Sequence, residues 1–62
     1  MDEDVKTEYV LRWLTAEGQL NCLTYQWRMD ARERAEELME EHKAGRQRLL
    51  SLTLTTYEYY ID

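Results

Sequence analysis

The feature of this 62-residue sequence that most constrains its fold is an amphipathic stretch at residues 30–45. Its apolar side chains recur at helical spacing and fall on one narrow arc that comprises Ala31, Ala35, Leu38, Met39 and His42. Asp30 and Glu33 form a D-x-x-E capping box, which predicts that the helix starts at Asp30. Gly45 is suited to the left-handed conformation that ends a helix. The sequence therefore predicts one helix from Asp30 to Gly45 with a single face for burial.

The segments on either side of this helix alternate between apolar and polar residues, as strands do. Residues 5–14 and 19–29 predict two strands, joined by a type I turn at residues 15–18 with Gly18 left-handed. The run 49–61 (LLSLTLTTYEYYI) predicts a third strand, longer than the first two.

The turn fixes the register between the first two strands if Thr15 faces Gln19. One face then carries the pairs Trp13–Asn21, Leu11–Leu23, Tyr9–Tyr25 and Val5–Met29. The other face carries the pairs Leu14–Leu20, Arg12–Cys22, Val10–Thr24 and Glu8–Gln26. The apolar sets of the two strands share the first face, so we expect the helix to pack there.

Taken in order, these elements predict one α+β domain of ββαβ type spanning residues 1–62, with residues 1–4 as a frayed acidic tip. The sheet is mainly antiparallel, and the helix packs across one face. A right-handed crossover allows the third strand to lie beside the first or beside the second, and we favour the order 2-1-3. One helix leaves the second sheet face open, and an exposed face of that kind is typical of an interface.

Composition narrows the class of protein. Thirteen acidic and eight basic residues give a net charge of −5, which disfavours direct binding to nucleic acid and favours a basic partner. Cys22 is the only cysteine and the acidic start lacks the apolar segment of a signal peptide, so we expect a cytoplasmic location. No apolar run reaches membrane-spanning length. Five tyrosines and two tryptophans are typical of protein interfaces.

Residues that could carry chemistry occur singly. His42 is the only histidine and lies on the apolar arc of the helix, where a structural role is the usual one. Cys22 lacks a base at any recognisable spacing, and Ser51, the only serine, lacks the G-x-S-x-G context of a nucleophile. We therefore predict that the chain is not an enzyme and binds no metal or cofactor.

Two surfaces are candidates for partner binding. The first is a glutamate ridge on the helix arc opposite the apolar stripe, comprising Glu33, Glu36, Glu37, Glu40 and Glu41. The alternative for this ridge is a solvated face with an i,i+4 pair between Arg32 and Glu36. The second is the end of the third strand, where Tyr57, Tyr59 and Tyr60 are expected to project past the neighbouring strands with aromatic rings on both faces. The alternative for these tyrosines is that they cover the edge of the core.

At the level of element order, the hairpin, the helix and the long last strand resemble small phage-encoded inhibitor proteins. These include the phage inhibitor of bacterial RNA polymerase and some anti-CRISPR proteins. The resemblance covers most of the chain and rests on element order alone, so it carries over no functional residue. It implies a chain that acts by occluding the surface of a larger partner.

We therefore expect a non-enzymatic protein-binding module, an acidic inhibitor of a larger protein with a basic surface, such as a host nucleic-acid enzyme or a CRISPR defence complex. One alternative is a self-associating accessory protein that forms a homodimer through its sheet. Another is a small RNA-binding sheet domain, for which Arg12, Arg28, Arg46 and Arg48 would have to gather at one end.

Overall fold

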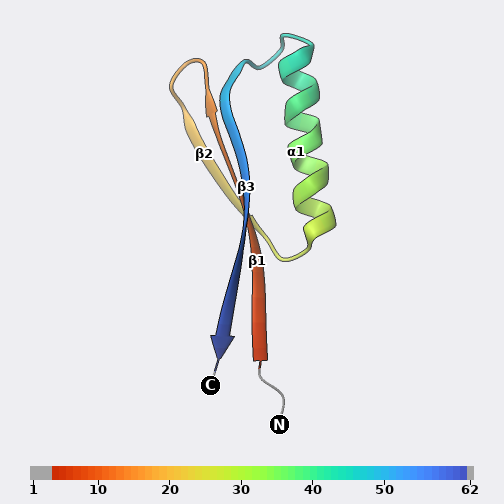
Figure 1. Ribbon diagram of the computed structural model, residues 1–62. Coiled ribbons are helices and arrows are strands. Elements are labelled where there is room, and N and C mark those ends of the chain that lie inside the picture. Colours follow the sequence, from red (N-terminus) through yellow and green to blue (C-terminus); the bar gives the residue numbers. More distant parts are fainter. Residues whose placement is uncertain (1–3, 62) are drawn as a thin grey trace.

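The computed structural model describes residues 4–61, which form three strands and one helix in the order ββαβ (Figure 1). The elements are β1 (Asp4–Thr15), β2 (Leu20–Tyr25), α1 (Arg28–Lys43) and β3 (Leu49–Ile61). The sheet is antiparallel with the order β2-β1-β3, so the predicted α+β fold and strand order 2-1-3 are confirmed. Within the described residues, no helix has the length and apolar character needed to cross a membrane.

The hairpin that joins β1 and β2 has the predicted register from Tyr9–Tyr25 to Leu14–Leu20. The amide of Gly18 donates to the carbonyl of Thr15 at 2.9 Å, and Gly18 adopts a φ of 88°, the left-handed conformation that was predicted. The buried Thr15 also accepts a hydrogen bond on its hydroxyl from the Gln19 amide, at 3.1 Å. This residue therefore anchors the turn through both its backbone and its side chain.

The second strand is shorter than predicted, because it ends at Tyr25. The predicted pairs Val5–Met29 and Glu8–Gln26 are therefore wrong, and this part of β1 pairs with β3 alone. The alternating pattern continues past Tyr25 into the first turn of the helix, where Met29 is 74% exposed. An apolar residue at the right spacing does not extend a strand once the chain has turned away from the sheet.

The helix begins at Arg28, two residues before the predicted start at Asp30. Trp27 precedes it with an extended backbone and makes no side-chain capping hydrogen bond, so the predicted capping box is wrong. Asp30 instead lies in the first turn, where its carboxylate interacts favourably with the helix dipole. At the other end, Gly45 has a φ of 78°, and the left-handed residue predicted there is confirmed.

The core lies between α1 and the part of the sheet where all three strands pair. Leu11, Trp13 and Leu38 form its buried centre, and Leu11 has no exposed surface at all. Around them pack the partly buried residues Tyr25, Ala35, Leu49 and Leu52. Ala31 is fully buried on the helix, and its small side chain suits close packing against the sheet. Met39, which was predicted on the buried arc, is instead exposed beside β3.

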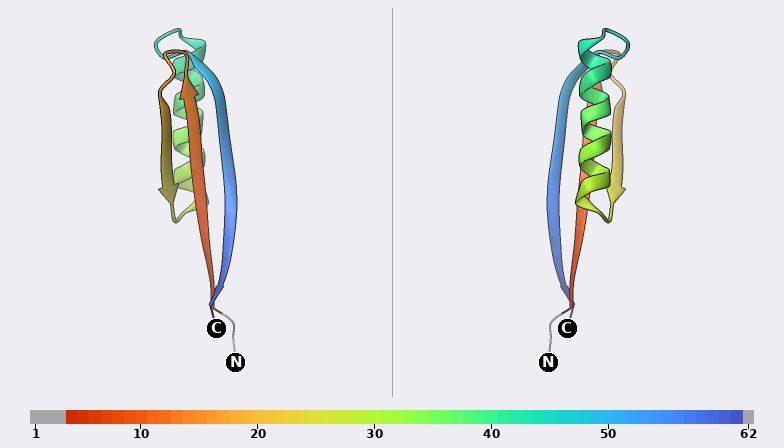
Figure 2. Two further views of the ribbon diagram at one scale, coloured as in Figure 1. Left: turned by 90° about the vertical axis from the view of Figure 1, so that its left-hand side faces the viewer. Right: turned by 90° about the vertical axis from the view of Figure 1, so that its right-hand side faces the viewer.

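The molecule is elongated. Its Cα atoms span 51 × 21 × 11 Å, and their radius of gyration is 14.3 Å, against about 11 Å for a compact chain of this length. The cause is that β1 and β3 continue together past the end of β2 and the start of α1 (Figures 1 and 2). We call this two-stranded segment, residues 4–8 and 57–61, the arm.

The arm corrects two predictions about the chain ends. The third strand does not project alone, because β1 pairs with it residue by residue from Glu8–Tyr57 to Asp4–Ile61. Of the expected frayed tip at residues 1–4, positions 1–3 lie outside the described residues, and Asp4 is already part of β1.

Candidate interaction surfaces

The predicted glutamate ridge lies along α1. Four of its members are exposed and Glu41 is half-buried, the exposed ones being Glu33, Glu36, Glu37 and Glu40. Glu36 forms an i,i+4 ion pair with Arg32 at 3.7 Å, and Glu37 forms a shorter i,i+3 pair with Arg34 at 3.0 Å. These pairs neutralise part of the charge of the ridge, and the pair between Arg32 and Glu36 is the one that the solvated-face alternative predicted.

The other two exposed glutamates of the ridge, Glu33 and Glu40, differ from Glu36 and Glu37 in their ion pairs. Within residues 4–61, neither Glu33 nor Glu40 has an ion-pair partner. Residues 28–43 carry six acidic and four basic side chains, so the helix as a whole is negative. Glu33 and Glu40 are therefore the exposed glutamates of the ridge whose charge no ion pair offsets among residues 4–61.

Arg34 has a role that the sequence did not indicate. Its guanidinium lies 5.9 Å from the ring centroid of Trp13, which places a cation over the largest side chain of the core. The same guanidinium holds Glu37, so Arg34 joins the ridge to the buried centre. The sequence signal was its position beside Ala35, at the border of the apolar arc, from which a long side chain reaches over a packed aromatic ring.

The three candidate tyrosines lie in the arm and do not form one surface. Tyr57 and Tyr59 share the open sheet face, whereas Tyr60 pairs with Val5 on the face that α1 covers farther along the sheet. Tyr60 is 66% exposed and Val5 is 48% exposed, because α1 does not extend over this part of the sheet. The structure therefore gives the arm aromatic rings on both faces, as predicted, but separates them from the glutamate ridge.

The open sheet face exposes little apolar surface at its centre. Val10 is buried there in the central strand, between Thr24 of β2 and Thr55 of β3. Arg12 lies on the same face, and its interactions with the Cys22 side chain and then with Tyr57 raise the pKa of Arg12 above its ordinary value. The exposed apolar residues of this face lie instead near its end, at Leu20 and Leu50.

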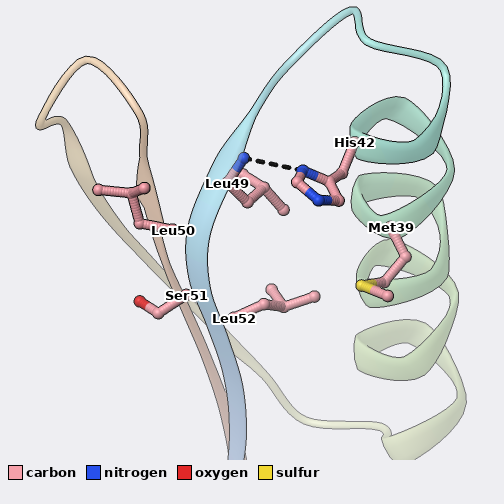
Figure 3. A pocket seen from close by; sticks show the side chains of 6 residues that line it. All are labelled: Met39, His42, Leu49, Leu50, Ser51 and Leu52. Atoms are coloured by element: carbon pink, nitrogen blue, oxygen red, sulfur yellow. Dashed lines mark hydrogen bonds between the residues drawn. The ribbon is translucent and has the colours of Figure 1, made fainter.

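A groove of about 250 Å³ separates the end of α1 from the start of β3 (Figure 3). Met39 and His42 point from the helix toward Leu49 and Leu52, while Leu50 points away to the other side of the sheet. Nδ1 of His42 accepts a hydrogen bond from the Leu49 amide at 3.0 Å, which ties the helix end to β3. The role of His42 is therefore structural.

The structure also bears on chemistry and on RNA binding. Cys22 lies on the sheet face opposite His42, so the two do not form a nucleophile–base pair. In the described part of the chain, no three His, Cys, Asp or Glu residues are placed to hold a metal ion.

Arg28 starts the helix and Arg46 follows its end, about 24 Å along a 16-residue helix. Arg28 and Arg46 therefore lie at opposite ends of α1, so the four arginines do not all gather at one end.

Comparison with models of protein families, with characterised proteins and with solved structures finds no match for this chain.

Proposed function

We propose that this chain is a non-enzymatic interaction module that binds a larger protein with a basic surface. The observation that supports this function best is the arm. Among residues 4–61, no helix and no third strand packs against its two strands, and Val5, Tyr59 and Tyr60 are exposed there. An isolated two-stranded ribbon is marginally stable in water, so a partner that packs against it stabilises it.

Charge selects the kind of partner. The chain has a net charge of −5, and Glu33 and Glu40 are exposed on the helix. Acidic carboxylates steer a basic surface toward them and fix its orientation. Binding at such a surface occludes it, which is the inhibitory mode that the resemblance to phage-encoded inhibitors implies. A host nucleic-acid enzyme or a CRISPR defence complex carries a basic surface of this kind, and the proposed place of action is the cytoplasm.

The test uses two matched pairs of substitutions. Glu33→Gln with Glu40→Gln removes unpaired carboxylates, whereas Glu36→Gln with Glu37→Gln removes carboxylates held by arginines. Each double variant changes the net charge by the same amount. The wild-type chain, coupled to a resin, recovers the partner from a bacterial lysate, and the kinetics with all three chains are then measured at several salt concentrations.

We expect association to slow as salt rises, and to slow equally in both double variants, because long-range steering depends on net charge. Dissociation should be faster only in the Glu33/Glu40 variant, which loses direct contacts. A partner that binds both variants like the wild type, without dependence on salt, would remove the ridge from the interface.

A further inference from the structure

The outer edge of β3 is long and unprotected. It runs from Leu49 to Ile61, and no other element of residues 4–61 pairs with it. Natural edge strands are usually kept apart by Pro, Lys, strong bulges or short length. This strand contains no Pro, Gly or Lys, its only charged residue is Glu58, and the only register shift is near its start. Such an edge is a template for another strand.

We propose that a second copy of this chain covers this edge. The two β3 strands pair antiparallel about a two-fold axis at Thr55 and join the two sheets into one of six strands. Thr55 is the midpoint of Leu49–Ile61, so this register pairs the full length of both strands. Antiparallel pairing about an axis perpendicular to the sheet leaves both helices on the same face.

The groove and Tyr60 support this register. Pairing about Thr55 places Glu58 of one copy opposite Leu52 of the other, so Tyr60, two residues along on the same face, lies diagonal to Leu52 beside the groove that Met39 also borders, whereas Leu50 points to the other face. Tyr60 lies on the sheet face that carries the helix, which is also the face of the groove. Its exposed ring therefore meets an apolar recess of the second copy, and the symmetry repeats this contact at the other end.

The distribution of charge also favours a second copy. Six of the thirteen acidic residues lie on α1, whereas β3 carries Glu58 alone. Pairing along β3 therefore brings neutral surfaces together, and salt screens the repulsion between the two helices. A strand of 13 residues is about 44 Å long and about 10 Å deep, so pairing buries on the order of 900 Å² in total, which is the size of a weak, reversible interface. We therefore expect the dissociation constant of the dimer to lie in the micromolar range.

This dimer goes beyond the proposed function and does not depend on it. If both are correct, the dimer presents two acidic helices on one face to a basic partner. The dimer is measured on the pure chain, so its absence would leave the binding of a hetero-partner standing, and the reverse also holds.

The experiment compares two threonines that flank Val10 on the same face. Thr55 is on β3 and Thr24 is on β2, and both are exposed. Thr55→Lys puts two like charges opposite each other at the two-fold axis, whereas Thr24→Lys puts the same charge on the other edge of the sheet. Sedimentation is measured from low micromolar to several hundred micromolar, and circular dichroism checks that both variants fold.

We expect the wild type and Thr24→Lys to form the same dimer, and Thr55→Lys to dissociate about tenfold more readily or to be monomeric. A second pair of variants tests the groove. Tyr60→Ala should weaken the dimer more than Tyr59→Ala, because Tyr59 lies on the opposite face of the arm. Higher salt should leave the dimer intact.

Three results would overturn the proposal. The first is a wild-type chain that stays monomeric over the whole concentration range. The second is a dimer that Thr24→Lys breaks and Thr55→Lys does not, since this would place the contact on β2. The third is a dimer that salt dissolves, because that result would require contacts between charged surfaces.

Discussion

The same two strands, β1 and β3, behave differently in two regions of this molecule. Where β2 and α1 also pack, Leu11 is fully buried; in the arm, Val5 of the same strand is 48% exposed. The backbone pairing between β1 and β3 continues across the boundary. Strand pairing therefore gives order to the arm, but burial also needs a third strand and a packed helix, which residues 4–61 supply only to the first region.

The largest expected effect comes from truncating the core beside the helix. Leu11→Ala should lower the free energy of unfolding by about 2–5 kcal/mol, because it leaves a cavity against Leu38 and Trp13. For so small a core, that loss is enough to unfold much of the protein. Val5→Ala, the matched truncation in the arm, should cost less than about 1 kcal/mol, since its side chain already contacts water.

Urea denaturation followed by circular dichroism measures both changes at a concentration where the chain is monomeric. Equal losses in the two variants would mean that the arm is as well packed as the core, and the contrast between the regions would fail.

The next effect concerns the hydrogen bond that joins the end of α1 to the start of β3. His42→Ala should cost about 1–2 kcal/mol, because the Leu49 amide loses its acceptor at the point where the helix end meets β3. Lys43→Ala, next in the sequence and exposed, is the control and should change stability by a few tenths of a kcal/mol. Unfolding midpoints measure both. A His42 variant as stable as its control would show that water replaces the imidazole.

A smaller effect distinguishes Arg34 from Arg32, the other arginine that pairs with a glutamate of the ridge. Arg34→Met should cost about 0.5–1 kcal/mol, because it removes the cation over Trp13 and the pair with Glu37. Arg32→Met removes only an exposed ion pair with Glu36 and should cost a few tenths of a kcal/mol. Tryptophan fluorescence should shift in the Arg34 variant alone, and identical changes in both would contradict the stacking role.

Much of the fold followed from local patterns. The register of β1 and β2 was predictable because Gly18 fixes the turn and the apolar residues alternate toward one face. The end of β2 was not predictable, because Tyr25, Trp27 and Met29 continue the strand pattern across the point where the chain leaves the sheet.

The candidate surfaces were predicted less well, because they depend on contacts between distant residues. The sequence located the glutamates, but not which of them arginines hold, since that depends on side-chain conformation along α1. The sequence predicted aromatic rings at the end of β3. It did not predict that β1 pairs with this end, because nothing local at residues 4–8 distinguishes a strand that a helix covers from one that it does not.

Residue-resolved hydrogen exchange tests the contrast between the two regions most directly. In the monomer, we expect amides of the arm, at residues 5–8 and 57–60, to exchange far faster than those of β1 at residues 10–14, because the arm can open without unfolding the core. Equal protection of the two regions in the monomer would contradict it, since the arm would then need no other molecule to stabilise it.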